Sequence, residues 1–220
     1  RNYLQSTLLS NSSNRISEFQ LGGNHGRRVG TAFANVDIGW QHGTGAFDAQ
    51  GNDHPQGSQP VARYDKYSLT ASYLQPITLK GQRFSLDSLI SGQYSEDVLF
   101  SPQRISLGGL ASIRGFKEQT LSGDSGLYWR SNVRWQQAIT QPQINPWLNE
   151  VGIALGYDLG VISGTRYNAN RHGRLAGNAL ELSARGPHIA ASLTLAQSLS
   201  RPDVIDRAEH PVYFRFDLFF

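Results

Sequence analysis

Apolar and polar residues alternate along most of this chain, so that every second side chain is of the same class. From Leu127 to Trp135 the odd-numbered positions are mostly apolar and the even-numbered positions polar. From Val151 to Val161 the odd positions read Val, Ile, Leu, Tyr, Leu and Val, whereas the even positions read Gly, Ala, Gly, Asp and Gly. A period of two is that of a β-strand with two unlike faces. The pattern therefore predicts an all-β chain.

The same alternation divides the chain into eight clear strands and one or two weaker ones. The clear strands are Val29–Gln41, Tyr64–Ile77, Arg83–Asp97, Leu127–Ile139, Glu150–Ile162, Arg174–Arg185, His188–Ser200 and Val212–Phe220. The weaker ones are expected within Asn2–Asn11 and Arg15–Leu21. Most are longer than the about 5–6 residues usual in soluble proteins, and they approach the about 9–11 residues with which a tilted strand spans a bilayer.

The connections between the clear strands alternate between long and short. The long ones are His42–Arg63, Val98–Gly126, Ser163–Gly173 and Arg201–Pro211, and the short ones are Thr78–Gln82, Thr140–Asn149 and Gly186–Pro187. Outer-membrane barrels have long loops on the cell surface and short turns in the periplasm. The alternation therefore predicts that the C-terminus lies on the periplasmic side.

A soluble β-sandwich is the competing interpretation, because its strands also alternate, although they are shorter and meet in one core. No apolar run approaches the about 18 residues of a membrane-spanning helix, and a spanning chain without such a helix has to be a closed barrel. Aromatic residues near the predicted strand ends favour the membrane, because they would form its interfacial girdle. They are Trp40, Tyr64, Tyr67, Phe84, Tyr94, Trp147, Tyr213 and Phe220. The expected fold is a transmembrane antiparallel β-barrel.

The composition excludes several kinds of chemistry. The chain has no Cys, which rules out a disulfide scaffold, a zinc–cysteine cluster and a thiol nucleophile. Its six His show no metal-ligand spacing, and its formal net charge of +3, without a basic stripe, argues against nucleic acid. Because no nucleophile with a nearby His fits an outer-membrane hydrolase, we expect neither an enzyme nor a cofactor nor a metal.

Two short motifs stand out against this alternating background. The longest connection contains Ile113-Arg114-Gly115-Phe116, and two strands later comes Gly156-x-Asp158-x-Gly160. Asp158 alternates with apolar neighbours, so its carboxylate faces the lumen, and the two flanking glycines leave room there for a loop to approach. A loop folded into the pore would bring Arg114 to Asp158 as a charge-assisted pair, and Gly115 would permit a tight turn at its tip.

With these two motifs the chain resembles the superfamily of outer-membrane protein assembly and secretion pores. Members of that superfamily carry a Val/Ile-Arg-Gly-Phe/Tyr signature in the sixth extracellular loop and a Phe/Gly-x-Asp-x-Gly signature on the inner wall of a sixteen-stranded barrel. The strand ending in Phe216, Leu218 and Phe220 resembles the C-terminal assembly signal of the superfamily. The resemblance implies that this chain supplies about eight to ten of sixteen strands.

Within that superfamily the chain most resembles the TpsB transporters of two-partner secretion, through Leu107-Gly108-Gly109-x-x-Ser112 followed by the Ile113 motif. The resemblance implies export of a large unfolded TpsA-type exoprotein (haemolysin, adhesin or toxin) across the Gram-negative outer membrane. It also implies assembly by the barrel-assembly machinery, contact with outer-membrane lipid and a monomeric pore. Residues 1–220 would be the C-terminal part of the barrel. The chain starts at Arg1 rather than Met, so further residues are expected upstream, and the resemblance implies that they include a plug helix and two POTRA domains.

Two other functions remain open from the residues alone. One is an insertase of the same superfamily, which assembles other barrels and would differ in its number of POTRA domains. The other is a passive porin, in which lumen charges tune ion selectivity. In every case the polar side chains expected to line the lumen are Arg130, Asn132, Arg134, Gln136 and Asp158.

Overall fold

The computed structural model describes residues 3–4, 7–8, 15–47, 49, 59–163 and 172–219. Nine long strands make one sheet: β3 (Ser17–Val29), β4 (Ala32–Thr44), β5 (Asp65–Leu79), β6 (Gln82–Tyr94), β9 (Ser125–Ala138), β10 (Glu150–Ser163), β11 (Gly173–Arg185), β12 (Ile189–Ser200) and β13 (Val212–Leu218). Four short strands complete the described part: β1 (Tyr3–Leu4), β2 (Thr7–Leu8), β7 (Ile105–Leu107) and β8 (Leu121–Gly123). A 3₁₀ turn, η2, covers Ser101–Gln103.

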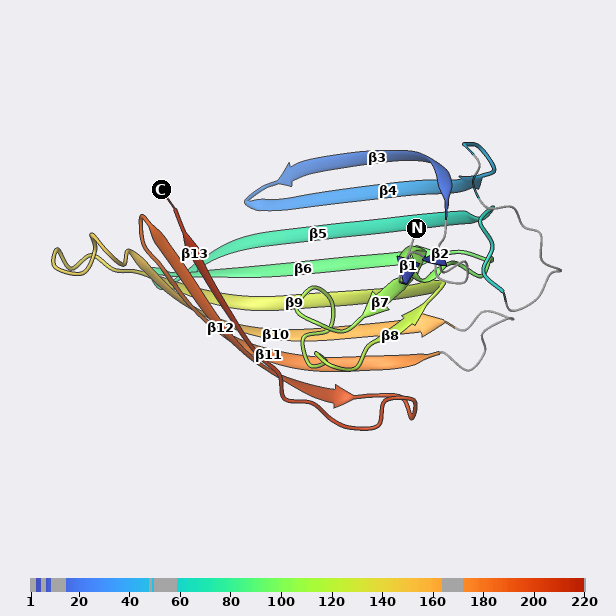
Figure 1. The fold of residues 1–220 in the computed structure, drawn as a ribbon. Coiled ribbons are helices and arrows are strands. Elements are labelled where there is room, and N and C mark those ends of the chain that lie inside the picture. The colour runs from blue at the N-terminus through green and yellow to red at the C-terminus, as the bar shows by residue number, and fades with distance from the viewer. Residues whose placement is uncertain are drawn as a thin grey trace.

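The nine strands are antiparallel and follow the chain order from β3 to β13, so that each pairs with its sequence neighbours except where β7 and β8 intervene between β6 and β9. Figure 1 shows the curved sheet, with the hairpin of β7 and β8 lying against the strands β9 and β10. The expectation of an all-β chain built as an antiparallel barrel wall is confirmed, and the nine strands fall within the expected eight to ten.

The strand boundaries differ from expectation at the N-terminal end of the sheet. Val29, expected to open a strand, instead closes β3, and β4 begins only at Ala32. β3 extends well beyond the predicted Arg15–Leu21, because its glycine-rich stretch pairs residue by residue with β4 from Ser17 to Val29. Pairing with β4 thus makes this segment a strand although its apolar and polar residues do not alternate. In the middle of the sheet β6 stops at Tyr94, short of the predicted Asp97.

The connections after β4, β6, β10 and β12 lie at one end of the sheet (Figure 1), and the expected alternation of lengths is confirmed from β3 to β9. It is wrong beyond β9, because the connection after β9, residues 139–149, was expected to be short but is longer than the one after β10, residues 164–172. At the opposite end, residues 30–31 and 80–81 are two-residue turns. Lys80 and Gly81 have φ values of 50° and 77°, as a tight hairpin turn requires. The connection from β9 to β10 is closed by a hydrogen bond of 2.9 Å from the Ile139 N–H to the Asn149 carbonyl.

The two faces of the sheet differ as a membrane barrel requires. Apolar side chains on one face remain exposed, as Phe214, Phe216 and Leu218 do on β13 with 71%, 53% and 55% of their surface accessible. In a sandwich a second sheet would cover this apolar face, and among the described residues none does. Among the described residues, no helix is long and apolar enough to cross a membrane.

Two of the aromatic residues assigned to the interfacial girdle do not belong to it. Tyr64 is only 1% exposed and contacts Glu18 through its hydroxyl, and Tyr213 bonds inward to the loop that lies on the sheet. The hydroxyl group of each ring has a hydrogen-bond partner on the inner side of the sheet. The sequence pattern does not reveal these partners. Tyr67, Tyr94 and Trp147 are exposed as expected. Phe220 lies outside the described residues.

The buried hydrophobic cluster lies between the loop after β6 and the inner face of the sheet. Its members come from the loop, from the wall strands and from the connection after β12: Leu107, Ile113, Phe116, Leu121, Ile162, Leu175 and Ile205. The loop thus carries its own apolar contacts to the wall.

Candidate functional site

The loop between β6 and β9 is anchored at its base by Asp124. The carboxylate of Asp124, 1% exposed, accepts hydrogen bonds from the Leu99 N–H at 2.9 Å and from the Arg104 Nε at 3.0 Å. Gln93 on β6 donates to the carbonyl oxygens of Gln103 and Asp124, both at 2.9 Å. These bonds fix the two ends of the loop to the strand that precedes it. The short hairpin of β7 and β8 can therefore project over the wall.

The tip of the loop is a compact turn built on glycines. Gly108 and Gly109 have φ values of 129° and 83°, a conformation that side-chain-bearing residues rarely adopt. The Ser112 hydroxyl bridges the N–H and carbonyl of Gly108 at 2.8 and 2.9 Å, and the Gly109 N–H donates to the Phe116 carbonyl. The Phe116 N–H donates to the Ile113 carbonyl at 3.2 Å, which closes a turn around Arg114.

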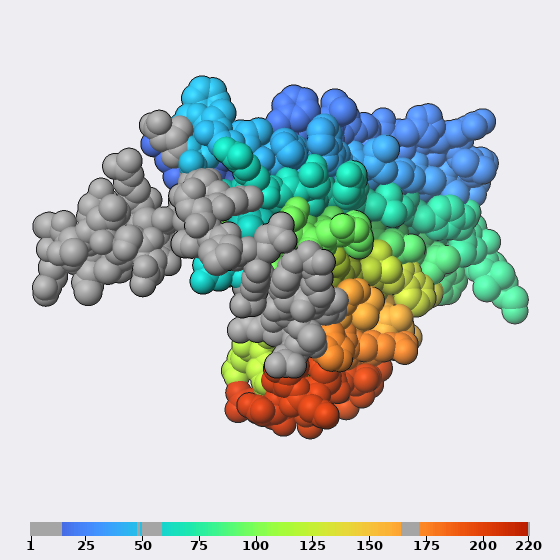
Figure 2. Space-filling model, turned by 90° about the vertical axis from the view of Figure 1, so that its right-hand side faces the viewer, coloured from blue at the N-terminus to red at the C-terminus, as the bar shows by residue number. Residues whose placement is uncertain are grey.

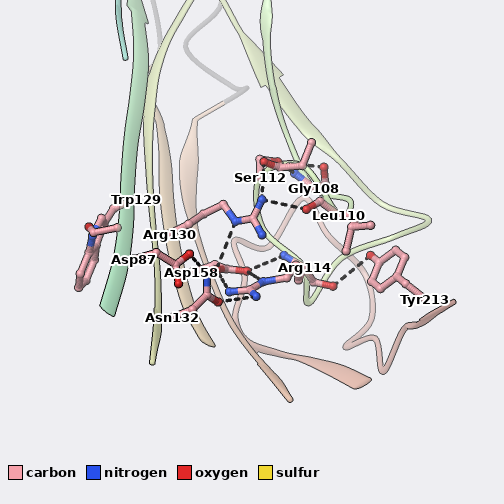
Figure 3. Close-up of polar contacts among 12 residues, drawn as sticks. Asp87, Gly108, Leu110, Ser112, Arg114, Trp129, Arg130, Asn132, Asp158 and Tyr213 are labelled. Carbon is pink, nitrogen blue, oxygen red and sulfur yellow. Dashed lines mark hydrogen bonds and ion pairs between the residues drawn. The ribbon is translucent and has the colours of Figure 1, made fainter. Parts of the chain in front are cut away.

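The guanidinium of Arg114 lies on the carboxylate of Asp158 at the centre of the inner wall (Figure 3). Its Nε donates to Oδ2 at 2.8 Å and its Nη2 to Oδ1 at 2.6 Å, and the Arg114 backbone N–H adds a third bond to Oδ2 at 2.9 Å. The Asp158 side chain is fully buried and that of Arg114 is 3% exposed. A bidentate pair that excludes water combines strong attraction with fixed geometry.

Two residues of β9 extend this pair into a network. The Asn132 amide accepts from Arg114 Nη1 at 2.7 Å and donates to the Asp87 carboxylate of β6 at 2.8 Å. Arg130 donates from Nη1 to the loop carbonyls of Leu110 and Ala111 at 3.0 and 2.9 Å. Both residues were expected to line the lumen, and both are hydrogen-bonded to the loop that lies there.

Glycines on the wall make room for the loop. A methyl group added to Gly156 would collide with the Arg114 guanidinium and lie 2.5 Å from the Asn132 side-chain oxygen. One added to Gly160 would lie 2.8 Å from Leu107, and one added to Gly177 would lie 3.0 Å from the Gly115 nitrogen. Gly177 faces Asp158 across the β10–β11 ladder and was not singled out from the sequence, because no motif marks it. The three glycines form a floor without side chains.

Gly115 serves a different purpose from the one expected. Its turn forms, but its φ is not among the positive values, so the turn alone does not require glycine. A methyl group there would lie 2.5 Å from the backbone carbonyl oxygen of Gln197 on β12. Glycine is therefore needed because the loop tip touches the backbone of the wall.

The last strand and the connection before it hold the loop from a second side. Figure 2 looks onto the end of the sheet that carries the long connections, where the segment after β12, in red, adjoins the yellow-green loop. The Tyr213 hydroxyl bonds to the carbonyl oxygens of Arg114 and Phe116 at 3.1 and 3.3 Å. The Glu209 carboxylate accepts from three successive loop N–H groups, those of residues 117, 118 and 119, at 2.7, 2.9 and 2.9 Å. Sequence patterns missed both residues, since their partners lie about 90 residues away.

The ionisation of Glu209 follows from these contacts. Burial opposes the charged form, but the three N–H donors and the nearby Arg207 outweigh burial and lower the pKa of this carboxyl below its ordinary value. The carboxylate is therefore charged at neutral pH and acts as an acceptor for the loop backbone.

The remaining predicted residues lie on the two expected faces. Arg134 and Gln136 continue the inner face of β9, where Arg134 pairs with Glu181 at 2.8 Å and Gln136 donates to Glu150 at 3.1 Å. Phe216 and Leu218 lie on the outward, apolar face of β13. The role of the C-terminal residues as an assembly signal stays a prediction.

Comparisons with known proteins agree with this architecture. A family model described as haemolysin secretion/activation protein ShlB/FhaC/HecB matches residues 1–184. The chain is similar to the outer membrane transporter CdiB of Escherichia coli O6:K15:H31, with 30% identity over 97% of this chain and 35% of that protein. It is 29% identical to the hemolysin transporter protein HpmB of Proteus mirabilis over 71% of this chain and 28% of that protein. The chain spans about a third of the length of these relatives or less.

Solved structures give the same result for the fold. CdiB from Escherichia coli superposes with a TM-score of 0.85 at 29% identity, over 99% of this chain and 39% of that one. CdiB from Acinetobacter baumannii gives a TM-score of 0.78 at 22% identity, over 98% of this chain and 36% of that one, which supports the fold alone.

Proposed function

Because this chain belongs to the ShlB/FhaC/HecB family of haemolysin secretion/activation proteins, we propose that it is the C-terminal wall and gate of an exoprotein-exporting pore. The chain is part of a β-barrel in the Gram-negative outer membrane, and its relatives are named transporters rather than enzymes. The exported molecule is an unfolded TpsA-type exoprotein that enters from the periplasm and folds at the cell surface. The pore uses no catalytic step, cofactor or metal for this transfer.

The observation that carries the proposal is the buried pair of Arg114 and Asp158, which fixes a long loop against the inner wall. A porin wall has no need of a desolvated ion pair that is satisfied only when the loop lies inside. Separating such a pair leaves two charges without partners, at roughly 3–5 kcal/mol. The loop is therefore a gate that stays closed until something compensates for the loss, and contact with the entering exoprotein supplies that compensation.

The rest of the inner face suits the passage of an extended chain. Toward the short-turn end this face carries two ion pairs, Arg134 with Glu181 and Arg83 with Glu150. Paired, hydrated charges offer an unfolded polypeptide few unsatisfied groups to which it could bind. The wall thus guides the chain without binding it tightly.

The other partners follow from the same family. We propose that a plug helix and POTRA domains precede this segment in the whole protein and recognise the exoprotein. The exposed apolar face, including Phe216 and Leu218, contacts lipid and presents the C-terminal strand to the barrel-assembly machinery. The pore acts as a monomer. Two POTRA domains before Arg1 are expected for a transporter, and a different number would favour the insertase.

Charge reversal tests the gate in the full-length protein. Arg114→Asp and Asp158→Arg are each expected to reduce export of the exoprotein strongly, since each places like charges together in a buried site. The double variant restores the pair in the opposite sense and should recover part of the export. The amount of folded barrel in the outer membrane is measured alongside. Normal barrel levels without recovery in the double variant would contradict the gate.

A further inference from the structure

Arg130 lies beside the pair of Arg114 and Asp158 without taking part in it. Its Nε is 3.8 Å from Asp158 Oδ1, which is within ion-pair range but beyond a hydrogen bond. That Nε is buried and has no hydrogen-bond partner among the described residues. The guanidinium is instead held through Nη1, which donates to the loop carbonyls of Leu110 and Ala111 (Figure 3). A buried N–H donor without an acceptor is uncommon and calls for an explanation.

The charges around the site balance only while the loop is in place. With the loop latched, the site holds two arginines, Arg114 and Arg130, and two carboxylates, Asp158 and Asp87, the latter linked through Asn132. Withdrawal of the loop removes Arg114 and leaves one cation with two carboxylates. It also removes the two carbonyls that hold Arg130. The same movement therefore deprives Asp158 of its partner and frees Arg130.

We propose that Arg130 is the stand-by partner of Asp158, ready to take over the carboxylate when the loop leaves. The two residues face each other across the β9–β10 ladder, so the wall itself keeps them together in both states. Once its Nη1 is released, the Arg130 guanidinium turns toward Asp158 and its idle Nε closes the remaining gap. Asp158 then keeps a cationic partner whether the loop is inside or outside. Arg130 is a positioning residue for the gate, and it makes the two states close in free energy.

This inference rests on the proposed withdrawal of the loop, and the reporter must detect that withdrawal directly. Ser112 is 4% exposed at the loop tip, and this chain contains no Cys. A full-length transporter with Ser112→Cys as its single cysteine therefore reacts with a membrane-impermeant maleimide only when the loop leaves. Every variant carries this reporter cysteine, and the amount of folded barrel in the membrane is measured for each.

The two roles open to Arg130 predict opposite signs for Arg130→Gln. If Arg130 merely anchored the loop through Leu110 and Ala111, its loss would loosen the loop and speed labelling. As a stand-by partner, its loss leaves Asp158 unpaired in the released state, and labelling slows by roughly tenfold. Arg130→Lys keeps the charge and should restore labelling to within about threefold of the parent. Arg134→Gln, on the same face of β9 but paired with Glu181, is the matched control and should leave the rate unchanged.

Neutralising the carboxylate separates the two roles further. With Asp158→Asn there is no charge to compensate, so adding Arg130→Gln should no longer slow labelling. Faster labelling of Arg130→Gln in the parent background, or equal slowing in the Asp158→Asn background, would overturn the stand-by role while leaving the gate intact. Continued export with no labelling of the reporter cysteine would instead show that the loop never leaves, and both proposals would fall.

Discussion

The hydroxyl of Tyr213 donates a hydrogen bond of 3.1 Å to the carbonyl oxygen of Arg114. Arg114 is therefore bound both by the last strand, β13, and by Asp158 of β10. Asp158 binds the side chain and the backbone N–H of Arg114, and Tyr213 binds its carbonyl oxygen. The loop is therefore latched at two places that lie on different strands. Each of them can be weakened separately.

Tyr213→Phe removes only the hydroxyl and keeps the ring. Loss of its bonds to Arg114 and Phe116 should weaken the latch by about 1 kcal/mol, which corresponds to roughly fivefold faster labelling of the reporter cysteine introduced by Ser112→Cys. Tyr157→Phe on β10 is a suitable control, because that ring is on the outward face against Trp129. Equal effects of the two substitutions would show that Tyr213 does not hold the loop.

Glu209→Gln tests the contact of Glu209 with the three loop N–H groups and the pH dependence of that contact. The folded pKa of Glu209 is lowered, so its contribution is fully present above the ordinary carboxyl pKa of about 4.3 and is lost as the pH falls through the folded value. Because maleimide reacts with the thiolate, the labelling rate is divided by that of a free thiol at the same pH. This ratio should rise for the parent on acidification below about pH 4.3, whereas Glu209→Gln should already label fast at pH 7 and lack that step.

A control for the pH experiment is available in the same loop. Glu118→Gln removes an exposed carboxylate whose side chain pairs with Arg207. An exposed pair of this kind contributes little, so this variant should keep the acid-induced step. Disappearance of the step in Glu118→Gln would show that the step does not come from Glu209.

Gly156→Ala probes the glycine floor beneath the loop. The added methyl group meets both the Arg114 guanidinium and the Asn132 side chain, so the pair has to shift, at about 1–3 kcal/mol of latch stability. Gly23→Ala on β3 has room for its methyl group, with the nearest atom 3.9 Å away, and serves as the control. Faster labelling and lower export in Gly156→Ala alone would agree with the geometry, whereas identical behaviour of the two variants would contradict it.

Phe116→Ala tests the apolar part of the latch. Phe116 is fully buried in the cluster between loop and wall, so truncation should remove about 3–5 kcal/mol. Thermal unfolding of the detergent-solubilised barrel and labelling of the reporter cysteine both measure the loss. Phe214→Ala, on the exposed outward face, should affect labelling far less. A small change in Phe116→Ala would mean that the polar contacts alone hold the loop.

The sequence by itself determined the wall. Alternation with a period of two is a local property, because successive side chains of a strand point to opposite faces, and it revealed the eight clear strands with errors of a few residues at their ends. The parity of the connections likewise follows from the chain order. The sequence also indicated the pair of Arg114 and Asp158, since the alternation places the carboxylate on the inner face, the flanking glycines leave room for a loop, and both motifs resemble those of the superfamily.

Only the tertiary structure decided what holds the loop and how. Glu209 and Tyr213 meet the loop from about 90 residues away, and neither carries a local signal that distinguishes it from a surface carboxylate or an interfacial aromatic. Gly115 is required by the Gln197 backbone, which is brought there by the curvature of the sheet. Arg130 was expected to line the lumen, and only the structure shows that it donates to the loop carbonyls and leaves its Nε beside Asp158. Such contacts depend on how strands distant in sequence pack together, and a residue pattern records only the strand to which each belongs.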